Sequence, residues 1–171
     1  MRELIIGGAR SGKSALAVRL ARSSGLAVSV IVTAVAGDAE MAERIARHRA
    51  ERPSEWRVVE ASIALGPALC AESARDRVVI VDCLTLWLSN LLLAEAPFPA
   101  ERAALLDALS AAPGRVLLVA NEVGGGVVPT NALARRFRDE AGALNQALAA
   151  VCERVTLVTA GLPLVLKGPP L

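Results

Sequence analysis

Gly7-Gly8-Ala9-Arg10-Ser11-Gly12-Lys13-Ser14 is the stretch of sequence that decides the fold. It satisfies Gly-x-x-x-x-Gly-Lys-Ser/Thr, a pattern in which glycines let the backbone curl so that successive N–H groups face phosphate oxygens. The strand-like run Leu4-Ile5-Ile6 precedes it, and a helix is expected over residues 14–22. This strand and helix context is what makes the pattern informative. The stretch therefore predicts a phosphate-binding P-loop.

Each residue type in this stretch has an expected part in holding a nucleotide. The predicted nucleotide-binding residues are Gly7, Gly8, Ala9, Arg10, Ser11, Gly12, Lys13 and Ser14. The Lys13 ammonium would neutralise the β- and γ-phosphates, which makes Lys13 a candidate catalytic residue, and the Ser14 hydroxyl is a candidate Mg²⁺ ligand. The N-terminus of the following helix adds a favourable dipole for anions.

A second candidate Mg²⁺ ligand ends a later apolar run. Val78-Val79-Ile80-Val81 is followed directly by Asp82. Open α/β sheets bind ligands at the carboxyl ends of their strands, and P-loop enzymes place a metal-binding acid there. We therefore expect Asp82 to end a neighbouring strand and to share Mg²⁺ with Ser14.

Short apolar runs rich in β-branched residues recur along the chain. They cover residues 4–6, 28–33, 78–81, 116–119 and 155–158, with weaker candidates at 57–60 and, as a final edge strand, at 164–166. Runs of this length that alternate with helical stretches are typical of buried parallel strands. The pattern predicts an α/β fold with a mostly parallel sheet flanked by helices. No internal repeat or boundary divides the chain, so one domain is expected over residues 1–171.

Helical periodicity is clearest in residues 130–151. Leu133, Phe137, Leu144, Leu148 and Val151 share one face there, which predicts an amphipathic helix. Another helix is expected over residues 38–52, from a candidate cap at its first residue to the proline that follows it. Residues 94–100, with two prolines, are interpreted as a surface loop.

Composition excludes several classes of protein. The 171 residues carry 19 Lys+Arg against 17 Asp+Glu, and aromatic residues make up 2%, which argues against a nucleic-acid-binding surface. The longest stretch without a charge has 15 residues, fewer than a membrane span needs. The first residues lead straight into a strand-like run, unlike a cleaved signal peptide. The 3 cysteines lack CxxC spacing and fit reduced core thiols of a cytoplasmic protein.

The single histidine, His48, lies in an arginine-rich stretch. On a helix, Met41, Arg44, Ile45, His48 and Arg52 share one stripe, which places His48 between two guanidinium groups. One interpretation is a solvated basic helix face that happens to contain a histidine. The other is that the arginines bind a polyphosphate and leave a neutral imidazole free to attack phosphorus.

Beside the P-loop, five further blocks of sequence form a specific set. They are Asp38-Ala39-Glu40-Met41 with Arg44-Ile45 and His48; Arg52-Pro53 with Trp56; Val81-Asp82-Cys83-Leu84-Thr85 with Asn90-Leu91; Asn121-Glu122-Val123-Gly124 with Val128-Pro129; and Leu133-Ala134-Arg135 with Phe137-Arg138-Asp139, Gly142 and Asn145-Gln146. Together with the P-loop they resemble the bifunctional adenosylcobinamide kinase/adenosylcobinamide-phosphate guanylyltransferase family of adenosylcobalamin assembly. The resemblance runs from Gly7 to about Lys167.

The resemblance implies a RecA-like P-loop fold and two reactions. One phosphorylates adenosylcobinamide with ATP or GTP, and the other transfers GMP from GTP to adenosylcobinamide phosphate through a guanylylated histidine, which here is His48. The product is adenosylcobinamide-GDP, and Mg²⁺ assists. Family members assemble as homo-oligomers, commonly trimers.

The resemblance also implies further contacts to the guanine nucleotide. These residues are Thr33, Ala34, Val35, Arg49, Ala50, Glu51, Arg52 and Glu60. The sequence departs from some relatives by carrying Asp82 where they carry Glu, and the shorter acid is expected to affect the kinase rate and metal preference. Residues 121–129, with three consecutive glycines, are interpreted as a mobile loop beside the substrate or simply a flexible strand-to-helix connection.

Three other classes of function predict different features of the sequence or the reaction. A P-loop kinase for another small metabolite would transfer only the γ-phosphate and leave His48 uninvolved. A guanine-nucleotide switch would carry Asn-Lys-x-Asp, which Asn121-Glu122-Val123-Gly124 is not. A metal or thiol enzyme lacks a ligand set, since one histidine and three scattered cysteines supply none.

Overall fold

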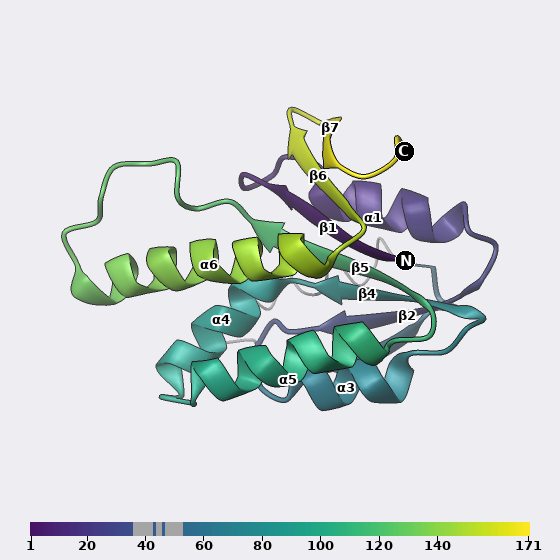
Figure 1. The fold of residues 1–171 in the computed structure, drawn as a ribbon, viewed down its shortest axis with the longest axis horizontal. Helices are drawn as coiled ribbons and strands as arrows, with labels where there is room; N and C mark the ends of the chain where they lie inside the picture. The colour runs from purple at the N-terminus through teal and green to yellow at the C-terminus, as the bar shows by residue number, and fades with distance from the viewer. Residues whose placement is uncertain (36–42, 44–45, 47–52) are drawn as a thin grey trace.

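A computed structural model describes residues 1–35, 43, 46 and 53–171. Its described strands are β1 (Arg2–Gly7), β2 (Ala27–Val32), β3 (Arg57–Glu60), β4 (Arg77–Asp82), β5 (Arg115–Asn121), β6 (Arg154–Thr159) and β7 (Leu162–Lys167). They form one sheet in the order β3-β2-β4-β5-β1-β6-β7, in which only β7 runs antiparallel to its neighbour (Figure 1). The predicted α/β fold with a mostly parallel sheet is confirmed.

Helices cover both faces of this sheet. The described ones are α1 (Lys13–Arg22), α3 (Leu65–Glu72), α4 (Leu84–Leu93), α5 (Phe98–Ala111) and α6 (Ala132–Val151). Successive strand residues point to opposite faces, so Ile5 belongs to the core cluster that includes residues of α1, while Leu4 belongs to the one that includes residues of α3, α4, α5 and α6. Both faces of the central strands are therefore buried, which explains their continuous apolar runs.

The two weaker strand candidates are confirmed at the two edges of the sheet. β3 pairs with β2, and β7 pairs with β6. Most of their side chains are exposed, as in Val58 of β3 and Leu162, Leu164 and Leu166 of β7. Because an edge strand has a single neighbour and less cover, its sequence pattern is weaker than that of a central strand.

The interpretation of residues 94–100 as a surface loop is wrong from Phe98 onward. α5 begins at Phe98, whose side chain is buried, with the ring centroid 6.3 Å from that of Trp87. A proline in the first turn of a helix sacrifices no intrahelical hydrogen bond, so Pro99 is compatible with this start. The helix therefore starts at Phe98, whose burial stabilises it, although the two prolines favour a turn.

Two other expectations need correction. In α6, Leu144 and Leu148 are buried as predicted, but Leu133 is exposed because the first turn extends beyond the core. Among the cysteines, only Cys152 is a buried thiol, while Cys70 is exposed on α3 and Cys83 is half-buried.

Of the helix expected over residues 38–52, the structure describes only Glu43 and Ala46, both as helix; the rest of the range, His48 included, lies outside the described residues. None of the described helices combines the length and apolar content needed to cross a membrane.

Candidate active site

The P-loop links the end of β1 to the start of α1, as the sequence predicted. β1 ends at Gly7 and α1 begins at Lys13, so residues 8–12 form the turn between them. Gly7 lies against β6: a Cβ atom there would come within 2.2 Å of the carbonyl oxygen of Val158. A side chain at this position is therefore excluded, which explains the first glycine of the motif.

Lys13 lies inside the loop it follows. Its side chain is buried, with the residue 6% exposed, and its Nζ donates to the carbonyl oxygen of Gly8 at 2.6 Å and to Ser11 Oγ at 3.4 Å. Ser11 is also buried, whereas Gly8, Ala9 and Arg10 are exposed. The loop thus surrounds a buried ammonium group, and a buried cation attracts a polyanion strongly because water screens it little.

Asp82 lies at the same edge of the sheet as the P-loop but not on the strand next to β1. β5 separates β4 from β1, so the expectation of a neighbouring strand is wrong. Strand order follows from tertiary pairing and cannot be read from order along the chain. With about 4.8 Å between adjacent strands, the ends of β1 and β4 are ~10 Å apart.

The donors at this edge fit a Mg²⁺ ion. Ser14 supplies a partly exposed hydroxyl at the start of α1, and Asp82 a half-buried carboxylate. The described residues contain no group of three or more His, Cys, Asp or Glu that could hold a metal by itself. Mg²⁺ in nucleotide sites is typically bound by one or two protein oxygens, with phosphates and water completing the octahedron.

Thr33 is fully buried just after β2. Its hydroxyl donates to the carbonyl oxygen of Cys83 at 2.7 Å and accepts from the Cys83 N–H at 3.0 Å. Its own carbonyl accepts from Asn90 Nδ2 at 2.7 Å. These contacts tie the ends of β2 and β4 together, while nearby Ala34 is half-buried and Val35 exposed. Contact of these three residues with a nucleotide stays a prediction.

Glu60 ends β3 at the far side of the same edge. It is exposed, and its strand is separated from β1 by β2, β4 and β5. Four strand spacings amount to ~19 Å, so Glu60 and the P-loop cannot bind the same phosphate group. The remaining predicted site residues, Arg49, Ala50, Glu51, Arg52 and His48, lie outside the described residues.

The end of β5 lies between the P-loop and Asp82, where the sequence predicted only a mobile loop beside the substrate or a flexible connection over residues 121–129. The Asn121 N–H donates to Thr85 Oγ1 at 2.7 Å, and the Glu122 N–H donates to the Gly7 carbonyl at 2.9 Å. Thr85 follows Asp82 by three residues, so it anchors α4 to β5 beside the candidate metal ligand. Asn121 and Glu122 belong to one of the sequence blocks quoted above, and Thr85 belongs to another. Only the strand order brings these two blocks into contact.

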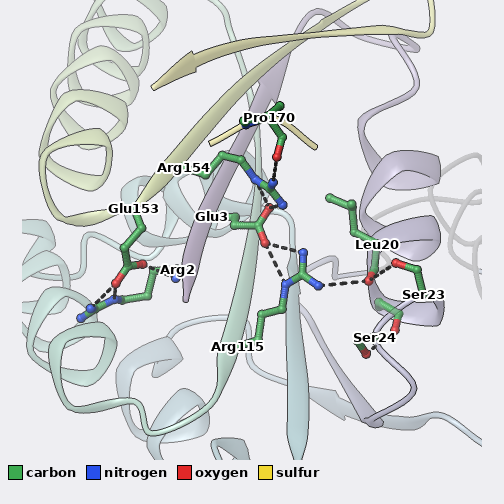
Figure 2. Close-up of polar contacts among 10 residues, drawn as sticks. Arg2, Glu3, Leu20, Ser23, Ser24, Arg115, Glu153, Arg154 and Pro170 are labelled. Atoms are coloured by element: carbon green, nitrogen blue, oxygen red, sulfur yellow. Dashed lines mark hydrogen bonds and ion pairs between the residues drawn. The ribbon is translucent and has the colours of Figure 1, made fainter. Parts of the chain in front are cut away.

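Another polar cluster lies at the opposite, amino-terminal edge of the sheet (Figure 2). The buried Glu3 carboxylate accepts from Arg115 Nε at 2.8 Å and from Arg154 Nε at 2.7 Å. Beside it, Arg2 pairs with Glu153 and holds the pKa of that carboxyl at about 2, mainly through the side-chain hydrogen bond. This cluster joins β1, β5 and β6 and lies away from the P-loop.

The fold, together with the loop between β1 and α1 at the carboxyl edge of the sheet, defines a P-loop NTPase. Solved structures with the same architecture include the RadB recombinase (TM-score 0.54, 18% identity, 91% of this chain and 73% of that one). The flagellar accessory protein FlaH of Methanocaldococcus jannaschii is similar (TM-score 0.53, 12% identity, 98% of this chain and 78% of that one). At such low identity these likenesses show the RecA-like fold alone.

Sequence comparison narrows this class to one family. The family model described as cobinamide kinase / cobinamide phosphate guanyltransferase matches residues 3–166, and the chain belongs to this family of enzymes. Over 100% of both chains it is 60% identical to the bifunctional adenosylcobalamin biosynthesis protein CobP of Pseudomonas aeruginosa. It is 39% identical to CobU of Salmonella typhimurium, across 96% of this chain and 98% of that one. The resemblance stated from the motifs is confirmed.

Proposed function

We propose that residues 1–171 form one domain with two activities on a corrinoid substrate. It phosphorylates adenosylcobinamide with ATP or GTP and transfers GMP from GTP to adenosylcobinamide phosphate, giving adenosylcobinamide-GDP. Family membership supports the substrate class. The observation that carries the proposal is the buried Lys13 ammonium enclosed by the loop between β1 and α1, because a kinase and a nucleotidyltransferase both need a polyphosphate at such a cation.

The proposed nucleotide site extends along the carboxyl edge of the sheet. Residues 7–14 hold the phosphates, and Ser14 and Asp82 hold Mg²⁺, which would neutralise the charge that develops on the phosphate oxygens. Thr33, Ala34 and Val35, residues 49–52 and Glu60 contact the rest of the guanine nucleotide. The ends of β1 and β3, where the P-loop and Glu60 lie, are ~19 Å apart, which supports a nucleotide that extends along the edge.

In the kinase reaction the substrate hydroxyl oxygen attacks the γ-phosphorus. The new O–P bond forms as the bond between the γ-phosphorus and the β,γ-bridging oxygen breaks, the nucleoside diphosphate leaves, and the hydroxyl proton passes to solvent. Lys13 stabilises the charge that builds up on the bridging and γ-oxygens. The loop N–H groups orient the phosphate for in-line transfer.

In the guanylyltransferase reaction His48 attacks the α-phosphorus of GTP. A P–N bond forms, pyrophosphate leaves, and the P-loop with Lys13 stabilises the departing charge. A phosphate oxygen of adenosylcobinamide phosphate then attacks the same phosphorus and displaces the imidazole. Two in-line displacements at the α-phosphorus thus replace a direct attack of adenosylcobinamide phosphate on GTP, which are both bulky anions.

Labelling with GTP carrying a radioactive α-phosphate tests this proposal. Wild type and His48→Ala are incubated with Mg²⁺ and the label, denatured and separated. An acid-labile, alkali-stable label on wild type alone is expected. If neither protein is labelled although both bind GTP, the covalent intermediate is wrong and a plain metabolite kinase with γ-phosphate transfer only takes its place.

We also propose that the protein acts in the cytoplasm as a homo-oligomer, with a trimer favoured. The exposed leucines of β7, Leu162, Leu164 and Leu166, support this because they place an apolar strip on an edge strand. Light scattering of wild type and Leu164→Lys tests it. A wild-type mass of one chain would overturn the proposal.

A further inference from the structure

The turn between β6 and β7 lies against the P-loop. The Gly161 N–H donates to the carbonyl oxygen of Ser11 at 2.9 Å. A Cβ atom on Gly12 would come within 3.2 Å of the Gly161 Cα, so the two backbones touch. β6 and β1 run side by side, and the β6–β7 turn lies at the end of β1 that leads into α1 (Figure 1).

The same hairpin contacts both ends of the loop. At the first end, the Val158 carbonyl of β6 occupies the space where Gly7 lacks a side chain. At the second end, Gly161 binds Ser11, which immediately precedes Gly12 and Lys13. The loop is therefore bracketed by one two-stranded unit that comes from the far end of the chain.

We propose that the β6–β7 turn, through the Gly161 N–H, positions the P-loop for phosphate binding. This inference rests on the proposed binding of nucleotide phosphates by residues 7–14. In a trans peptide the C=O and the following N–H point in opposite directions. Since Gly161 holds the Ser11 carbonyl toward the hairpin, the Gly12 N–H points away from the hairpin and is available to a phosphate oxygen. Gly161 is thus a positioning residue that does not touch the nucleotide.

The turn has a geometry that makes this testable. Its two residues, Ala160 and Gly161, have φ of 52° and 78°, as expected for a two-residue hairpin turn with two left-handed positions. A Cβ atom on Gly161 would meet nothing within 4 Å. Gly161→Ala therefore strains the turn without a steric clash, because alanine resists the left-handed conformation.

Gly25 provides a matched control. It has a φ of 67° and likewise nothing within 4 Å of a Cβ atom, but it lies in the turn between α1 and β2, away from the P-loop. Gly161→Ala and Gly25→Ala should each lower the Tm by about 2–8 °C, since both place alanine in a left-handed position. A difference between them in nucleotide binding then reports the contact to Ser11 rather than general strain.

The experiment measures the Kd of the full chain for GTP with Mg²⁺ by titration calorimetry, with inorganic pyrophosphate as a second probe. We expect Gly161→Ala to raise both Kd values about 3- to 10-fold, as for the loss of one hydrogen bond, and Gly25→Ala to leave them unchanged. Gly161→Asn should restore binding to within about twofold, because asparagine, which like alanine keeps the N–H, tolerates a positive φ and so leaves the turn in place.

Equal Kd values for wild type and Gly161→Ala would overturn the inference, as would equal weakening in both alanine variants. If wild type binds neither GTP nor pyrophosphate, the proposed nucleotide role of residues 7–14 is itself wrong. The two failures are therefore distinguishable.

Discussion

The hydroxyl of Thr33 makes two hydrogen bonds to a single residue, donating to the Cys83 carbonyl and accepting from the Cys83 N–H at 2.7 and 3.0 Å. The Thr33 N–H also donates to the carbonyl of Asp82 at 3.2 Å. These bonds join the ends of β2 and β4 directly beside the candidate metal ligand. The position of Asp82 therefore depends on a side chain that directly follows another strand.

Thr33→Val should destabilise the protein and disturb this edge. Valine keeps the shape but removes both hydrogen bonds: the Cys83 N–H loses its acceptor, while the Cys83 carbonyl keeps the Trp87 N–H at 3.2 Å. We expect a cost of about 1–3 kcal/mol. Urea unfolding measures the loss, and Thr33→Ser, which keeps the hydroxyl, serves as the control. A Thr33→Val protein as stable as wild type would show that the pair contributes nothing.

Lys13→Ala should abolish most nucleotide binding while leaving the fold intact. A hydrogen bond to a charged group contributes about 1.5–3 kcal/mol, so the Kd for GTP should rise by roughly 10- to 100-fold. Lys167→Ala is the matched control, because its Nζ binds the carbonyls of Ala149 and Ala150 at the end of α6. Equal GTP affinity in the two variants would contradict the role of Lys13.

Glu3→Gln should cost far more stability than Glu153→Gln. Removing the Glu3 charge leaves Arg154 buried without its carboxylate, with an expected loss of about 3–5 kcal/mol. The Glu153 side chain is 42% exposed, so its pair with Arg2 should contribute about 1 kcal/mol or less. Denaturant unfolding compares the two variants, and similar losses of stability would contradict a larger contribution from the buried carboxylate.

Stability should fall as the pH drops below the ordinary carboxyl pKa of 4.5. Burial raises the pKa of Glu72, but hydrogen bonds from Ser29 and Arg57 and the charges of Arg57 and Arg77 outweigh it, so the net shift is downward. The pKa of Glu153 is lowered to about 2. Because the folded state binds these protons less readily than the unfolded state, the stabilisation from both carboxylates is full above about 4.5 and falls as the pH drops, and the part from Glu153 is lost toward about 2.

Thermal unfolding between pH 6 and pH 2.5, with steps of about half a unit, checks this dependence. Glu72→Gln should flatten the acid limb, since glutamine does not titrate. An equally steep limb in that variant would show that Glu72 is not one of its causes.

A thiol reagent should modify one cysteine rapidly and two slowly. Cys70 is exposed, whereas burial, with the nearby Asp82 charge, raises the pKa of the Cys83 thiol, and burial together with Glu153 raises that of Cys152 to about 12. Since the thiolate is the reactive form, both should react slowly in the native protein. Cys70→Ser should remove the fast phase, and a fast phase that persists would contradict this order.

Much of the fold was predictable because its signals are local. The P-loop pattern, the apolar runs and the amphipathic stripe of α6 each arise from neighbours within one element, and all seven expected strands are present. The prediction of a loop over residues 94–100 was wrong from Phe98 onward. The side chain of Phe98 is buried against Trp87, which belongs to a different helix, and a local pattern does not contain that contact.

The sequence by itself determined the class of site: a cation, a hydroxyl and a strand-end acid, Lys13, Ser14 and Asp82, are types and spacings that a motif specifies. Tertiary structure decided the rest. Only strand order places β5 between the P-loop and Asp82, and only the pairing of β6 with β1 brings Gly161 to Ser11, 150 residues earlier in the chain. Local patterns encode what a residue can do, but hydrogen bonds between distant backbone segments depend on how the whole sheet assembles.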